Sequence, residues 1–77
     1  MNHIGIDILT DDKEKVLLAL EKMPDVIVTC VEDYRAEKGL RHSTILVDTE
    51  VWMSEFTNWL YINSVPHLQT YRSSIEP

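Results

Sequence analysis

The chain has 77 residues, of which 44% are hydrophobic and 26% charged, and its seven Lys or Arg against thirteen Asp or Glu leave a formal net charge of −6. This length allows a single domain over residues 1–77, with an ordered core over about 2–72, and the composition excludes a disordered tail. A single cysteine excludes a disulfide framework. The few basic residues are scattered and make no stripe that could neutralise phosphates, so direct nucleic-acid binding is not expected.

The first half of the chain predicts a strand, a helix and a second strand. Isoleucines alternate with small or polar residues over residues 2–9, which is the period of a half-buried strand. Asp11 and Glu14 resemble a capping box at the start of a helix, and Pro24 ends that helix. The β-branched and apolar run at residues 26–35 predicts a second strand.

The second half predicts a hairpin, a helix and a last strand. Gly39 can take positive φ in a loop over residues 36–41, ahead of a third strand at 43–48. Thr49 is the predicted cap of a second helix, and residues 65–72 predict a fourth strand. The large side chains of the second helix share one arc that should fill the core: Trp52, Met53, Phe56, Trp59 and Leu60.

The expected order is therefore β-α-β-β-α-β, in the α+β class. Short connections favour a ferredoxin-like plait, with an antiparallel sheet in the strand order 4-1-3-2 and both helices on one face.

Two joints of this chain resemble those of known plaits. Leu20-Glu-Lys-Met-Pro-Asp-Val26 and Phe56-Thr-Asn-Trp-Leu-Tyr-Ile-Asn-Ser-Val65 are similar to the helix-to-strand joints of ACT and Lrp/AsnC effector domains and of NapD-type chaperones, which bind a twin-arginine signal peptide. Ser64 stands where those families commonly have glycine, and no ligand-binding residue is carried over. The resemblance implies a non-catalytic module that binds a peptide, an effector or another copy of itself.

The residues that usually carry chemistry do not form a pattern here. His3 and His67 should lie at opposite rims of the sheet, so no metal site is expected from the histidines. Cys30 lies in an apolar strand with nothing to stabilise a thiolate, and the glycines form no phosphate-binding loop. We therefore expect no enzyme activity, no cofactor and no metal.

The second strand and its neighbour are the predicted interaction surface. Alternation turns Leu46 away from the helices, and it places Ile27 and Val31 opposite the face of Val28 and Cys30, so the strand is apolar on both sides. In the order 4-1-3-2 this strand is an edge, and Val28 and Thr29 lie in a part of it without proline or charge. An alternative partner surface on the helices contains Leu18 and Tyr61.

These patterns predict a non-enzymatic protein-interaction module, a homodimer that binds a protein or peptide partner as a small regulator, inhibitor or assembly chaperone. One alternative is an effector-sensing domain that binds a small ligand. Another is an acidic nucleic-acid mimic that inhibits a nucleic-acid-binding enzyme. The chain contains no apolar run of membrane-spanning length and no signal-peptide pattern at its start, so a cytoplasmic location and no membrane partner are expected.

Overall fold

A computed structural model of the protein describes residues 1–35, 39 and 41–73. The chain begins with strand β1 (Asn2–Leu9), a 3-10 turn η1 (Thr10–Asp12) and helix α1 (Lys13–Glu21). The remaining elements are β2 (Val26–Arg35), β3 (Arg41–Thr49), α2 (Met53–Ile62) and β4 (Gln69–Arg72). The expected order of strands and helices and the α+β class are confirmed.

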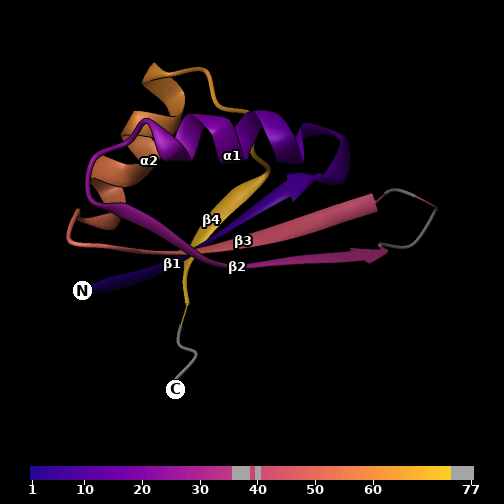
Figure 1. Ribbon diagram of the computed structural model, residues 1–77, viewed down its shortest axis with the longest axis horizontal. Helices are drawn as coiled ribbons and strands as arrows, with labels where there is room; N and C mark the ends of the chain where they lie inside the picture. The colour runs from indigo at the N-terminus through magenta and orange to yellow at the C-terminus, as the bar shows by residue number, and fades with distance from the viewer. Residues whose placement is uncertain (36–38, 40, 74–77) are drawn as a thin grey trace.

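The four strands form one sheet in the order β2-β3-β1-β4, with every neighbouring pair antiparallel. This is the predicted order 4-1-3-2, and it is consistent with a ferredoxin-like plait. Both helices lie on the same side of the sheet, and no described helix lies on the other side (Figure 1). The strands therefore present one face to α1 and α2 and one face that the described residues leave uncovered.

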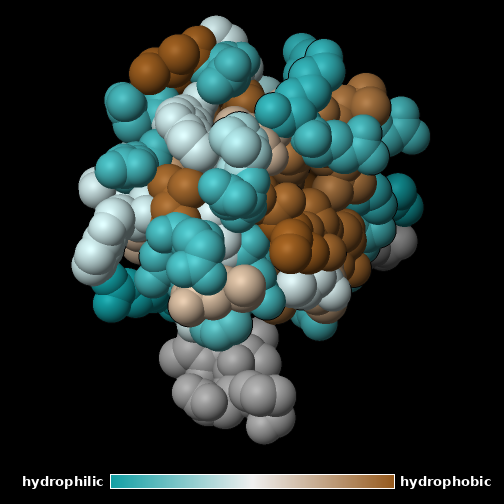
Figure 2. Space-filling model, turned by 60° about the vertical axis from the view of Figure 1, so that its left-hand side comes forward, coloured by the Kyte–Doolittle hydropathy of each residue, from teal (hydrophilic) through white to brown (hydrophobic). Residues whose placement is uncertain are grey.

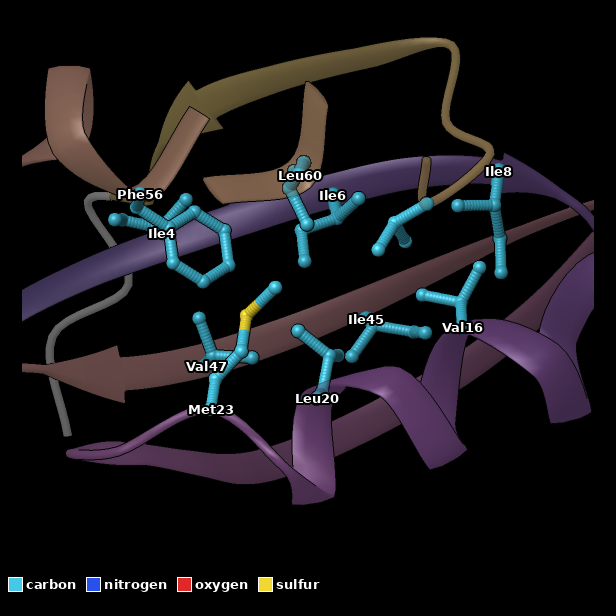
Figure 3. Packing of buried hydrophobic residues seen from close by; sticks show 11 residues of the cluster. Ile4, Ile6, Ile8, Val16, Leu20, Met23, Ile45, Val47, Phe56 and Leu60 are labelled. Carbon is cyan, nitrogen blue, oxygen red and sulfur yellow. The ribbon is translucent and has the colours of Figure 1, made fainter. Parts of the chain in front are cut away.

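The hydrophobic core lies between the sheet and the helices (Figure 3). Ile4, Ile6 and Ile8 of β1 are fully buried, as their alternation in the sequence predicts. Each helix supplies two fully or nearly fully buried side chains to the same cluster, and Figure 3 shows them pointing at the isoleucines: Val16, Leu20, Phe56 and Leu60. One side of the sheet thus carries most of the buried apolar surface.

Both predicted helix caps are wrong. Asp11 belongs to η1, and α1 begins after Asp12 without a side-chain hydrogen bond at its N-terminus. Thr49 is the last residue of β3, and its hydroxyl accepts a hydrogen bond from the Val51 N–H at 3.1 Å. The Thr49 hydroxyl thus bonds to the segment that follows β3 instead of capping α2, one of the local side-chain bonds that Thr can make.

Helix α2 is shorter and less apolar on its inner side than the sequence suggests. Trp52 precedes the helix and is 66% exposed, so its predicted place in the core is wrong, whereas Phe56 is fully buried. The last strand is also shorter than predicted, because the segment with Pro66 lies before β4. Ser64 takes a positive φ of 53° after α2, a conformation that glycine adopts more readily.

The hairpin between β2 and β3 is described only in part. Gly39 has a φ of 78°, which confirms the positive value expected there. The remainder of the predicted loop, residues 36–38 and 40, lies outside the described residues.

A β-bulge at Thr29 changes which way the second half of β2 faces. Val28 pairs with Val47, but Cys30 pairs with Leu46, so Thr29 is an extra residue. Paired residues share a face of the sheet, which places Cys30 on the uncovered face and Val31, the partner of Ile45, on the helix side. The predicted positions of Cys30 and Val31 are therefore both wrong, because alternation without a bulge assigns the opposite faces.

Candidate functional site

The side of the sheet that no described helix covers is here called the open face. Alternation and register place thirteen side chains of the four strands on this face. They are His3, Asp7, Leu9, Ile27, Cys30, Glu32, Tyr34, His42, Thr44, Leu46, Asp48, Gln69 and Tyr71. Of the predicted partner-binding residues, Ile27 and Leu46 lie on this face, and Val31 does not.

The part of the open face formed by β2 and β3 carries an apolar patch. Ile27 is 59% exposed, and the half-buried Cys30 and Leu46 are directly paired across β2 and β3. Tyr34 and His42 are also paired, with ring centroids 5.9 Å apart. On the side of the protein that Figure 2 shows, hydrophobic side chains also reach the surface in one larger patch and in smaller ones among hydrophilic side chains.

The charges of the open face have one sign. Asp7, Glu32 and Asp48 lie on it, and no described lysine or arginine side chain does. By alternation Arg41 and Arg72 lie on the helix side, and the remaining described basic side chains belong to α1 and the turn after it. Three of the thirteen acidic side chains thus lie on this face without a described lysine or arginine to balance their charge.

Hydrogen bonds hold the carboxylates of β1 and β3 in place. Thr44 donates to Asp7 Oδ1 at 2.8 Å, and the Gln69 side chain donates to Asp7 Oδ2 at 2.5 Å. The partners of Asp7 are neutral, so its negative charge is not cancelled. Asp48 lies 2.5 Å from Nδ1 of His3, at the other end of the same strands.

Tyr71 crosses the open face from the edge strand β4. Its ring lies directly over Gly5, so close that a β-carbon at residue 5 would overlap with the ring atoms. Burial raises the pKa of the Tyr71 phenol, and the negative charge of Asp7 raises it further. Sequence reasoning missed this aromatic side chain, although a glycine among the isoleucines of β1 is a signal of close approach by another group.

The pattern of main-chain hydrogen bonds shows which groups of β2 face the free edge. His3 and Asp7 accept hydrogen bonds from Ser73 and Leu68 at 2.8 and 2.7 Å, so odd-numbered residues of β1 turn toward β4. Successive residues of a strand turn their main-chain groups to opposite neighbours. The even-numbered residues of β1 therefore face β3, and Leu46, which lies between two of their partners, faces β2.

Thr29 confirms this direction, because its hydroxyl donates to the Leu46 carbonyl at 3.2 Å. Thr44 and Asp48, two residues away from Leu46 on either side, face β2 in the same way. Their partners in β2 and the partner of Leu46 therefore form main-chain hydrogen bonds within the sheet; these partners include Ile27, Cys30 and Glu32. The β2 residues next to these partners turn their N–H and C=O groups to the free edge. These are Val26, Val28, Val31 and Asp33.

The predicted edge is thus present, but its middle is not a regular strand. No proline or charge occurs from Val26 to Val31, as the sequence indicates. The bulge at Thr29, however, is one of the features by which natural proteins protect sheet edges. Regular pairing is possible on either side of Thr29 but not straight through it.

Polar side chains connect the C-terminal end of β2 to β3 and α1. Ser43 is fully buried and donates to Asp33 at 2.6 Å, while Lys13 of α1 reaches the same carboxylate at 2.9 Å. The hydrogen bond from Ser43 lowers the pKa of Asp33, and the hydrogen bond and charge of Lys13 lower it further. A shallow hollow of about 360 Å³ beside this cluster includes Thr10, which bonds to Ser43 at 2.9 Å.

The alternative surface predicted on the helices is not one continuous site. Leu18 lines a groove of about 760 Å³ between α1 and α2, together with Met23 and Trp59. Tyr61 does not line it and instead packs edge-on against His67, with ring centroids 5.2 Å apart. Leu18 therefore lines a groove between the helices, and Tyr61 belongs to a separate aromatic pair.

The three histidines occupy three different places. His3 is beside Asp48, His42 is against Tyr34, and His67 accompanies Tyr61 near the start of β4. His3 and His67 lie at opposite rims of the sheet, as the topology predicts. Among the side chains that the structure describes, no group of three or more His, Cys, Asp or Glu is arranged to hold a metal ion.

No model of a known protein family matches this sequence, and a search of curated proteins found no match either. Within the described residues, no helix has both the length and the apolar character needed to cross a membrane.

Proposed function

We propose that this chain is a non-enzymatic protein-interaction module with the ferredoxin-like plait, which binds a protein or peptide partner on its open face and also self-associates. The observation that carries the proposal is the combination of an apolar patch, Ile27, Cys30 and Leu46, with carboxylates near it and no described helix over it. Exposed apolar patches with a polar border are typical of protein-binding surfaces.

The chemistry of the open face favours a partner with basic residues. Asp7, Glu32 and Asp48 would attract lysine or arginine side chains, and the apolar patch would accept the apolar side of the same segment. Two open faces of this chain would instead bring like charges together, so self-association should use another surface. The role that suits such a module is that of a small regulator, inhibitor or assembly chaperone in the cytoplasm.

Native mass spectrometry of the protein purified from its own host tests the proposal. We expect a retained protein partner with the wild-type chain and with Glu14→Lys, a charge reversal on exposed α1. The same reversal at Glu32→Lys on the open face should abolish retention, because it places a cation where the partner's cation would bind. Equal retention by both variants would show that the open face is not the binding surface.

A second candidate function is the sensing of a small apolar effector, which the groove between α1 and α2 favours. Its volume of about 760 Å³ falls in the range of small-ligand sites, roughly 300 to 1,000 Å³. Leu18→Arg would fill the mouth of this groove without touching the open face. A metabolite that copurifies with the wild-type chain but not with Leu18→Arg would favour this function over the first.

A further inference from the structure

The free edge of β2 has two stretches on which another strand could pair. Edge-facing groups occur at Val26 and Val28 before the bulge, and at Val31 and Asp33 after it. The step across the bulge is three residues, whereas a regular strand repeats its edge groups every two residues. A partner strand can therefore be in register with one stretch but not with both.

The stretch after the bulge is unsuited to a second copy of the chain. An antiparallel pair in which Val31 bonds to Asp33 of the second copy places Glu32 directly opposite Glu32 of that copy. Like charges directly opposite each other on a sheet are destabilising. The exposed carboxylates of Glu32 and Asp33 thus disfavour pairing of this half of the edge with a second copy.

The stretch before the bulge is self-complementary. When Val26 of each copy exchanges hydrogen bonds with Val28 of the other, Ile27 faces Ile27 across the two-fold axis. Every side chain in this short contact is apolar, and Ile27 is the most exposed hydrophobic residue of β2. Burial of Ile27 and Val28 removes from water an apolar surface that the single chain leaves uncovered.

We propose that two copies of this chain associate by antiparallel pairing of Val26–Val28, in the single register centred on Ile27. The two sheets become one continuous sheet, with all helices on one side and the two open faces joined on the other. Each copy then contributes its own carboxylates to an enlarged acidic surface. This inference rests on the self-association proposed above and names the surface that produces it.

Disulfide trapping tests the register. Ile27 is bonded within its own sheet, so Ile27 and its counterpart form a pair without mutual hydrogen bonds, with Cα atoms about 4.5 Å apart. That separation lies within the range of disulfides, about 4.4–6.8 Å. In a Cys30→Ser background, Ile27→Cys should give a covalent dimer under mild oxidation, and Glu32→Cys, which reports the other register, should not.

Two proline variants form a matched pair that tests the main-chain contact. Val28→Pro and Val31→Pro each remove one edge-facing N–H and leave the hydrogen bonds to β3 intact. In sedimentation equilibrium, Val28→Pro should weaken dimerisation at least about tenfold, because each dimer loses a hydrogen bond in both of its equivalent pairs. Val31→Pro should leave the dimer unchanged.

Cross-linking by Glu32→Cys but not Ile27→Cys, or dissociation by Val31→Pro but not Val28→Pro, would overturn the proposed register. A wild-type chain that stays monomeric at micromolar concentration would overturn the contact altogether. Binding of the partner is measured separately with Glu32→Lys. A monomer that still retains its partner would thus leave the interaction function standing while the pairing fails.

Discussion

Phe56→Ala and Trp52→Ala together test which of the two aromatic side chains belongs to the core. The periodicity of the sequence places both in the core, whereas the structure buries only Phe56. Phe56 is fully buried between sheet and helices, so its truncation leaves a cavity and should cost about 3–5 kcal/mol of unfolding free energy. Trp52 is 66% exposed and precedes α2, so its loss should change stability by no more than about 0.5 kcal/mol.

The expected loss at Phe56 is large compared with the stability of the whole chain. At roughly 0.05–0.15 kcal/mol per residue, a domain of this length has about 4–12 kcal/mol in total. A loss of 3 kcal/mol lowers the Tm by about 12 °C or more, at roughly 4–8 °C per kcal/mol. The Phe56→Ala chain should therefore be largely unfolded on moderate heating.

Urea denaturation followed by far-ultraviolet circular dichroism measures both effects without relying on tryptophan fluorescence. Phe56→Leu provides a milder variant that stays folded if Phe56→Ala does not. The reasoning is refuted if Trp52→Ala costs as much as Phe56→Ala, since Trp52 would then belong to the core as the periodicity alone suggests.

Three further predictions concern polar and backbone features. The hydrogen bond from Ser43 lowers the pKa of Asp33, so the stabilisation from this bond is full above the ordinary pKa of 3.8 and is lost as the pH falls through the lower pKa of the folded state. The difference in unfolding free energy between wild type and Ser43→Ala, measured by urea denaturation, should therefore be larger at neutral pH than below pH 3.8. A difference that does not narrow in acid would contradict this. Gly5→Ala should push the Tyr71 ring into solvent and return its raised phenol pKa toward 10.0. Ultraviolet titration measures this pKa, with Tyr71→Phe as the reference. An unchanged titration would mean that the ring does not lie over Gly5. Ser64→Gly should raise the Tm by a few degrees, because glycine relieves a left-handed backbone strain of about 1–2 kcal/mol at a smaller entropic cost; a lower Tm in calorimetry would argue against this conformation.

The sequence was sufficient to predict the order of the strands and helices and most of the buried core. The alternation of isoleucines in β1 needs no knowledge of distant residues, since a strand with one buried face must place every second side chain in the core. Short connections then leave few ways to order four strands, and the observed order β2-β3-β1-β4 is the expected one.

Features that depend on distant pairing were not accessible to the same reasoning. Nothing local marks Thr29 as an extra residue, because a bulge is defined only by the register of β2 against β3. That single residue moves Cys30 to the open face and Val31 away from it. The position of Tyr71 over Gly5 likewise depends on the pairing of β4 with β1, which joins the two ends of the chain.

The local pattern of residues thus determined which segments become strands and helices and which faces of β1 and β3 are buried. The tertiary structure decided the composition of the open face and the usable part of the β2 edge. The physical reason is that periodicity records burial within one element, whereas a surface is assembled from side chains of several strands whose relative register is set by the packed sheet as a whole.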